Sequence, residues 1–305
     1  MGLGLDRPHA GGRFRLAGIV TAAMAIAWLL AACSSGSPSS HPSSPAPAPT
    51  TPATGATRPQ SSPSWLLTRA ALSQILIDDQ VKDVLHASRL YELLQPGQQP
   101  LSGISADPII TFASAATLEQ AVQSGQIPAG TYGVLYDPEA WSFTPTAEQR
   151  NPVAAARQAA AVAHAHGLKF LVAPALNLTT VLDPGSGPRW QAFLRLGLVS
   201  QLAKVADVVE LQAQSLERDT ATYASFVRAA ASQATTANPG VTVLAGLSTN
   251  PPGAVVTTQN LAAAIQATRS AVDGYWLNVP GQGARCPTCN ASRPDIAVET
   301  LKQLG

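Results

Sequence analysis

The run YGVLYDPE occupies residues 132–139, and the run KFLVAPAL occupies residues 169–176. Both are short, mostly apolar and rich in β-branched or aromatic residues, which predicts two buried strands. Between them, Asn151-Pro152 supplies a helix start, and Gly167 a residue just past a helix end. A strand, a helix and a strand at this spacing predict a βαβ unit with two parallel strands.

The same alternation extends through most of the chain. Further strand-like runs are Pro108–Ser114, Val208–Gln214, Val241–Thr249 and Val272–Val279. Most of the predicted strands start roughly 30–40 residues apart, which is the spacing of a strand with its returning helix. Repeated units of this kind predict an α/β domain whose parallel sheet is covered by helices.

Apolar stripes of helical period fill the intervals between these strands, and each predicts one helix. The stripes are Leu194-Leu198-Leu202-Val205, Tyr223-Phe226-Val227-Ala230, and Leu261 with Ile265. Thr257 or Thr258 is the expected N-cap of the last of these helices, because a hydroxyl there accepts a hydrogen bond from a free backbone N–H.

A parallel sheet of this kind is either a closed barrel or an open doubly wound sheet. No glycine-rich phosphate turn follows a predicted strand, since Gly281-Gln282-Gly283 precedes no helix at the required spacing. Polar and aromatic residues gather instead at the carboxyl ends of several strands, as in a (β/α)8 barrel of TIM type. We therefore expect that barrel. Its two remaining strands must come from residues 65–107, where Val84–Leu90 is the best candidate, or from the C-terminal tail.

The N-terminus carries a targeting pattern. Arg13 and Arg15 precede an apolar run from Leu16 to Leu30, which predicts a signal peptide over residues 1–32. The sequence Leu30-Ala31-Ala32-Cys33 resembles the lipobox of bacterial lipoproteins. That resemblance implies a diacylated Cys33 and a chain anchored by lipid to the extracytoplasmic face of the cell membrane. An ordinary secretory signal and an uncleaved anchor are the alternatives.

Residues 34–64 consist almost entirely of Ser, Pro, Ala, Thr and Gly. Such a segment cannot bury enough apolar surface to offset its ordering entropy. We therefore expect the lipidated Cys33 and a disordered linker over residues 33–64, followed by one barrel domain over residues 65–305.

The charge balance bears on possible partners. Loss of residues 1–32 removes Arg7, Arg13, Arg15 and Asp6, so the 19 basic and 18 acidic residues become 16 and 17. The remaining chain has a formal charge of −1 and no basic run, which argues against nucleic acid as a partner. We expect a monomer that uses no cofactor.

Polar residues cluster at the predicted strand ends. Because alternate residues of a strand face the same side, Leu135, Asp137 and Glu139 should share a face. By the same alternation Glu210 should share a face with Gln212, and Trp276 with Asn278. The residues expected together at one rim of the barrel are Asp137, Glu139, Trp141, Asn177, Glu210, Gln212, Asn250, Trp276 and Asn278.

Carboxyl pairs, amides and indoles at one rim are typical of carbohydrate sites, where carboxyls act as acid and base or nucleophile. The segments Asp137-Pro138-Glu139-Ala140-Trp141 and Glu210-Leu211-Gln212-Ala213-Gln214 resemble those of glycoside-hydrolase-type barrels, over roughly residues 105–280. The longer Asp-x-x-Asp-x-Asp-x-Glu signature of the chitinase-like barrels is missing. The resemblance implies Glu139 as the acid, Glu210 as the nucleophile or base, and Asp137 as the group that tunes Glu139.

Structural roles are the alternatives for these residues. Asp137 can form a turn before Pro138, Glu210 can be satisfied by a buried arginine, and Trp276 can belong to the core. Three functions therefore remain open: a barrel that binds and hydrolyses carbohydrate, a barrel that binds a glycan or protein without turnover, and an envelope scaffold with no small-molecule site.

Cys286 and Cys289 have the spacing of a redox motif, but they open no helix after a strand. Outside the cytoplasm a local structural disulfide is expected instead. Zinc would require two further ligands that the sequence does not offer nearby, so we expect no metal site.

Overall fold

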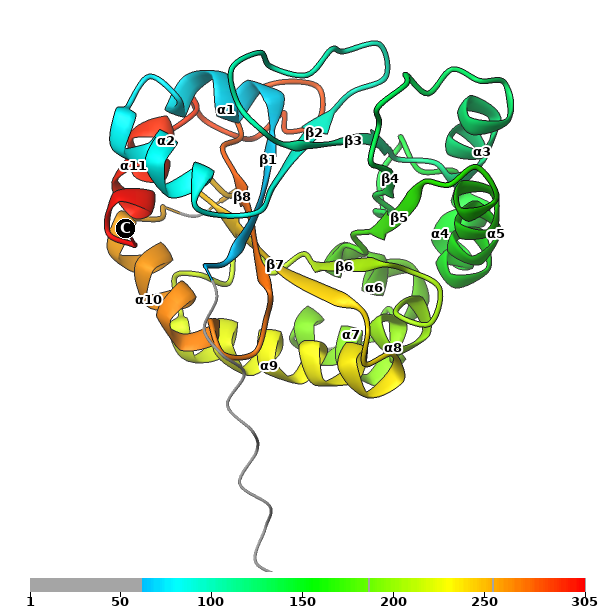
Figure 1. Cartoon of the computed structure of the whole chain (residues 1–305). Helices are drawn as coiled ribbons and strands as arrows, with labels where there is room; N and C mark the ends of the chain where they lie inside the picture. Colours follow the sequence, from blue (N-terminus) through cyan, green and yellow to red (C-terminus); the bar gives the residue numbers. More distant parts are fainter. Residues whose placement is uncertain (1–61, 186, 254, 305) are drawn as a thin grey trace, which may run out of the picture. The chain divides into compact units, whose positions relative to one another are not determined.

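Eight parallel strands close into a barrel in the computed structural model, which describes residues 62–185, 187–253 and 255–304 (Figure 1). Each strand pairs with the next along the chain, and β8 pairs with β1 to close the ring, with Trp65 opposite Tyr275. The prediction of a (β/α)8 barrel is therefore confirmed. The strands are β1 (Ser64–Thr68), β2 (Leu90–Leu94), β3 (Asp107–Phe112), β4 (Gly133–Tyr136), β5 (Lys169–Val172), β6 (Val208–Leu211), β7 (Thr242–Ser248) and β8 (Gly274–Asn278).

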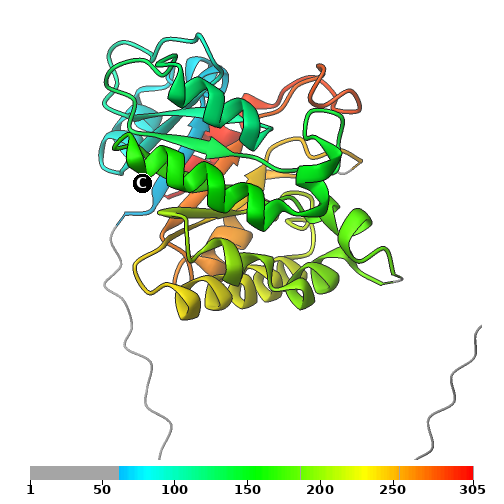
Figure 2. The ribbon, with the colours of Figure 1, turned by 90° about the vertical axis from the view of Figure 1, so that its right-hand side faces the viewer.

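Helices form the outer layer of the barrel, as Figures 1 and 2 show. The helices of the described residues are α1 (Arg69–Ile75), α2 (Asp79–His86), α3 (Ala115–Gln123), α4 (Thr146–Arg150), α5 (Pro152–Ala165), η1 (Leu176–Leu178), α6 (Thr179–Leu182), α7 (Arg189–Leu196), α8 (Leu198–Leu202), α9 (Thr220–Ala237), α10 (Thr258–Thr268) and α11 (Pro294–Lys302). Within these residues, no helix combines the length and apolarity needed to cross a bilayer.

The first two strands come from the predicted range 65–107, apart from Ser64, but the specific candidate segment there is misplaced. The candidate Val84–Leu90 is wrong for most of its length, because α2 extends to His86 and β2 begins only at Leu90. Asp78 caps α2 by accepting a hydrogen bond from the N–H of Val81, and Val81 and Leu85 are buried four residues apart. A helical period in this segment therefore overrides its local strand character.

Two apolar clusters confirm the alternation of faces along the strands. Leu135, Val208 and Trp276 belong to the cluster inside the barrel. Val134 and Val209, one residue away from two of them, belong to the larger cluster between strands and helices. Side chains two residues beyond Leu135 and Val208 therefore lie on the inner face, and these are Asp137 and Glu210.

Of two predicted helices, one is divided in the structure and the other has its expected cap. The stripe from Leu194 to Val205 forms two helices, α7 and α8, because Gly197 adopts a left-handed conformation with φ of 60°. Thr257 caps α10 as expected. Its hydroxyl accepts a hydrogen bond from the Asn260 N–H, and the Asn260 side chain accepts one from the Thr257 N–H, which forms a capping box.

The close approach of β8 to β1, where the barrel closes, explains why residue 274 is a glycine. A Cβ on Gly274, the first residue of β8, would overlap the backbone carbonyl of Ser64 in β1. Only glycine lets β8 and β1 pair at this register. The predicted signal peptide, most of the predicted linker and Cys33 lie outside the described residues.

Candidate carbohydrate site

A cavity of about 940 Å³ opens at the carboxyl ends of the strands. Residues that follow at least five different strands line it, so it is formed by the barrel as a whole. Its polar lining includes Arg69, Gln95, Asp137, Glu139, Asn177, Arg189, Gln212, Asn278 and Arg285. This is the end of the barrel at which the active sites of TIM-barrel enzymes lie.

Glu139 is a half-buried carboxyl in this cavity. One of its oxygens, Oε2, accepts a hydrogen bond of 3.1 Å from the Asn177 side chain. The same amide accepts one of 2.8 Å from the N–H of Ala140. Burial raises the pKa of Glu139, while the Asn177 hydrogen bond and the charge of Arg285 partly offset that rise. The result is an oriented carboxyl that holds a proton more tightly than a free one.

Asp137 lies deeper, with 5 % of its surface exposed, and also lines the cavity. Its Oδ1 accepts a hydrogen bond of 2.6 Å from Gln212, which also donates to the carbonyl of Ala173 at 2.8 Å. Burial and the nearby charge of Glu139 raise the pKa of Asp137 well above its ordinary value, against the opposing effects of Arg285 and Gln212. Two close carboxyls in such surroundings resist carrying two negative charges.

Glu210 lies beneath these groups and does not line the cavity. Only 1 % of its surface is exposed, and neither carboxylate oxygen has a hydrogen-bond partner among the described residues. Burial, together with the charges of Asp137 and Glu139, raises its pKa well above the ordinary value. The structure thus places Glu210 on the predicted face, without the buried arginine of the alternative interpretation, and favours its neutral form.

Three tryptophans line the cavity: Trp141 and Trp276, which the sequence singled out, and Trp190, which it did not. The Trp141 ring is fixed by a hydrogen bond of 2.9 Å from its Nε1 to the hydroxyl of Thr144. Trp276 is 7 % exposed and packs within the inner cluster of the barrel. It therefore contributes to the core as well as to the cavity wall.

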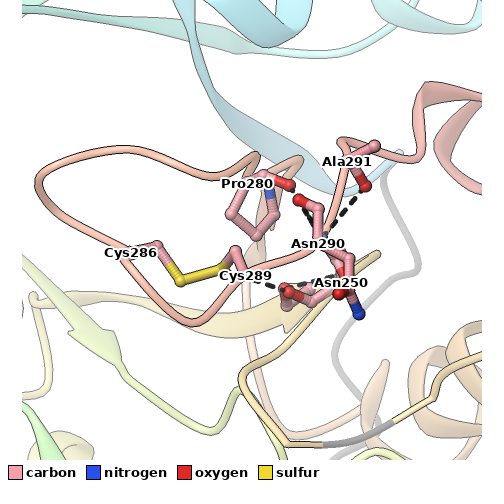
Figure 3. Close-up of a disulfide and its surroundings, with 7 residues drawn as sticks. Asn250, Pro280, Cys286, Cys289, Asn290 and Ala291 are labelled. Carbon is pink, nitrogen blue, oxygen red and sulfur yellow. Dashed lines mark hydrogen bonds between the residues drawn. A yellow bond between two sulfur atoms is a disulfide. The ribbon is translucent and has the colours of Figure 1, made fainter.

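Asn250 does not line the cavity, and its side chain is used to hold a loop (Figure 3). Its amide nitrogen donates to the carbonyls of Pro280, Asn290 and Ala291 at 3.1–3.2 Å. These bonds fix both ends of the loop 280–293, which connects β8 to α11. The predicted disulfide between Cys286 and Cys289 is present in this loop, and both cysteines line the cavity.

Several lining residues could not be found from strand patterns. Arg285, from the same loop, donates a hydrogen bond of 2.9 Å to the Gln95 side chain, which follows β2. Its guanidinium lies 5.8 Å from the centre of the Trp141 ring. Because Arg285 lies in a Gly-rich loop with no strand or helix period, the sequence pattern does not indicate that its side chain reaches the cavity. Among the residues that the structure describes, no group of three or more His, Cys, Asp and Glu side chains is placed to hold a metal ion.

Fold and cavity together define a TIM-type barrel with buried carboxyls at the carboxyl ends of its strands. No family model and no curated protein matches the chain. Among solved structures, the chain is similar to a GH128 (subgroup III) curdlan-specific exo-β-1,3-glucanase from Blastomyces gilchristii, with 12% identity and a TM-score of 0.47 over 80% of this chain and 99% of that one.

Two other solved structures show a similar degree of likeness. One is the spore cortex-lytic enzyme SleL from Bacillus megaterium, with 10% identity and a TM-score of 0.43 over 79% of this chain and 73% of that one. The other is the glycoside hydrolase domain of PgaB from Bordetella bronchiseptica, with 12% identity and a TM-score of 0.41 over 80% and 98%. These likenesses concern the barrel alone, and the chemistry of this cavity rests on its own residues.

Proposed function

We propose that the barrel binds a carbohydrate in this cavity and hydrolyses a glycosidic bond there, with Glu139 as the proton donor. The observation that carries the proposal is the position of Glu139. It is a half-buried carboxyl of raised pKa, held by Asn177, in a cavity lined by amides and indoles. Amides bind sugar hydroxyls, the flat faces of indoles suit sugar rings, and a carboxyl that keeps its proton can protonate a leaving oxygen.

Glycoside hydrolysis also needs a second carboxyl, as nucleophile or as base for water. Asp137 lines the cavity beside Glu139, whereas Glu210 lies beneath it. Two nearby carboxyls of this kind share one negative charge most easily. We assign Asp137 the role of the second carboxyl because it is the other carboxyl of the cavity lining, and this role requires it to give up its proton against the effect of burial on its pKa. Glu210 lies below the pair, outside the lining.

Activity assays on the chain from residue 34 onward test this assignment. That chain keeps all eight strands of the barrel. It is screened against aryl glycosides and cell-wall glycans beside the variants Glu139→Gln, Asp137→Asn and Glu210→Gln. We expect at least a hundredfold loss of kcat for the first two and a smaller loss for the third. Hydrolysis that survives both Glu139→Gln and Asp137→Asn contradicts the proposal.

Binding without turnover is the second candidate function. It is favoured by the burial of Asp137, which raises the pKa of this carboxyl well above its ordinary value and so disfavours the ionised form that a nucleophile or base needs. Calorimetry with the same glycans distinguishes the two functions. Heat of binding with no release of reducing sugar over a day supports the binding module and rules out the hydrolase for those glycans.

We also propose that the barrel is tethered to the extracytoplasmic face of the cell membrane through diacylated Cys33. The proposal is supported by the Leu30-Ala31-Ala32-Cys33 sequence after an apolar run and by the Ser/Pro-rich segment that follows. Two acyl chains suffice for stable anchoring. Cys33→Ser should release the protein from the membrane fraction and abolish labelling with a palmitate analogue. Unchanged labelling contradicts the proposal.

A further inference from the structure

Three arginines line the cavity, at positions 69, 189 and 285, together with two carboxyls and no lysine or histidine. Arg69 directly follows β1, Arg189 begins α7 and Arg285 lies in the loop after β8, so they converge on the cavity from separate parts of the chain. A guanidinium keeps its charge at every physiological pH. The lining holds only two carboxyls, Asp137 and Glu139, against these three guanidiniums, and burial raises the pKa of both. The cavity therefore has an excess of positive charge.

Arg285 is the arginine best placed to contact a ligand. It is exposed, and it extends from the loop that Asn250 and the disulfide hold in place (Figure 3). Figure 2 shows this red-orange loop projecting beyond the strands. A loop fixed in this way presents its side chain at a small cost in conformational entropy.

Most of the hydrogen-bonding capacity of Arg285 is open. A guanidinium has five N–H donors, and the hydrogen bond to Gln95 uses one of them. The guanidinium lies 5.8 Å from the centre of the Trp141 ring and 6.0 Å from that of Phe143, which supports it by cation–π attraction. The remaining donors suit the two parallel hydrogen bonds that a carboxylate accepts.

The other two arginines extend the positive lining. Arg69 has 34% of its side chain exposed, and its Nη1 lies 3.8 Å from Glu92, which is buried outside the cavity lining. Arg189 is exposed at the first position of α7, next to Trp190. Arg69 and Arg189 therefore place positive charge on two further sides of an acidic ligand that reaches Arg285, and this charge attracts the ligand.

We propose that the cavity selects a carbohydrate that bears a carboxylate, with Arg285 as the residue that determines this specificity. The inference rests on the proposed function, since it names the class of sugar that the same site binds. The competing role for Arg285 is that of a counter-ion for Asp137 and Glu139 alone, and this role predicts no preference for acidic ligands.

Calorimetry with matched sugars tests the inference. The probes are galacturonate oligosaccharides and glucuronate-bearing xylan fragments, each paired with its methyl ester, which keeps the backbone and removes the charge. The protein is the chain from residue 34 onward, as wild type, Arg285→Gln and the control Arg195→Gln. Arg195 lies on α7, outside the cavity lining, and pairs with Asp183 at the surface.

We expect wild type to bind at least one acid about tenfold or more tightly than its ester, because hydrogen bonds to charged groups are the stronger ones. Arg285→Gln should remove that preference, because it should weaken binding of the acid more than binding of the ester, and Arg195→Gln should leave the preference as it is in wild type. The preference should also weaken as salt rises.

Each other outcome is informative. Equal affinity for acids and esters overturns the inference and leaves the proposed function standing. A preference that persists in Arg285→Gln overturns the role of that residue. If neither these sugars nor the neutral glycans of the activity screen bind, the proposed function itself is contradicted.

Discussion

Glu217 offers a quantitative test of the electrostatics of this barrel. It lies in the loop between β6 and α9 with none of its surface exposed. Its Oε1 accepts a hydrogen bond of 2.7 Å from the N–H of Ser248, while Oε2 has no partner among the described residues. Burial raises the pKa of Glu217 to about 7, although hydrogen bonds from backbone N–H groups oppose the rise.

The sign of the effect follows from proton linkage. Between the ordinary pKa of 4.5 and the folded pKa of about 7, the unfolded chain has lost the proton and the folded chain keeps it. The free energy of unfolding therefore falls as pH rises through this window, by about 1.4 kcal/mol per pH unit, and levels off above it. The loss attributable to Glu217 is about 3 kcal/mol in all, of which about 2.5 kcal/mol falls between pH 5 and pH 8.

Glu217→Gln removes the ionisation and keeps an oxygen for the Ser248 N–H. Urea denaturation at pH 5, 6, 7 and 8 should show that the free energy of unfolding of the variant rises by about 2.5 kcal/mol relative to that of wild type from pH 5 to pH 8. Glu299→Gln is the matched control for the substitution itself, since Glu299 is an exposed glutamate on α11. If the Glu217→Gln curve runs parallel to wild type, the Glu217 carboxyl titrates normally and the reasoning is refuted.

Three further substitutions test how the barrel is held together. Gly274→Ala should lower the free energy of unfolding, measured by urea denaturation, by about 1–3 kcal/mol or more, because the new Cβ overlaps the Ser64 carbonyl. The control Gly283→Ala, with open space around its Cβ, should change this free energy little. Asn250→Ala should expose the loop 280–293 to limited proteolysis and cost about 1–3 kcal/mol, since the carbonyls that share its amide lose their donor. Thr257→Ala should lower the free energy of unfolding by about 1 kcal/mol, the usual contribution of an N-cap.

The fold was predictable where it depends on the period of apolar residues and on the spacing of strand-like runs. Alternation along 132–139 and 208–214 correctly placed Asp137 and Glu210 on the inner face, because strand side chains alternate whatever their neighbours are. The same approach gave the range of the first two strands, 65–107, but not their positions. In the segment near Val84, the local cap at Asp78 and the burial of Leu85 favour a helix, and the burial of Leu85 is a feature of tertiary packing.

The site was predictable in outline only. Alternation gives the face of a residue but not its depth, so it could not show that Glu210 lies below the cavity that Glu139 lines. It also could not show that the Asn250 amide is occupied by loop carbonyls. Arg285 and Gln95 are 190 positions apart, and only the packing of two loops brings them together. Sequence patterns therefore do not predict which loop residues reach such a site.

The direction of β1 has a practical consequence for handling this protein. Its first residue, Ser64, lies at the amino end of the barrel strands, and the cavity opens at their carboxyl ends. A group joined directly to residue 62 is thus attached at the end of the barrel opposite the cavity. Immobilisation on a sensor surface or a bead through a tag at that position should leave the opening free for long polymeric ligands, so polysaccharides as well as short oligosaccharides can be tested on the tethered protein.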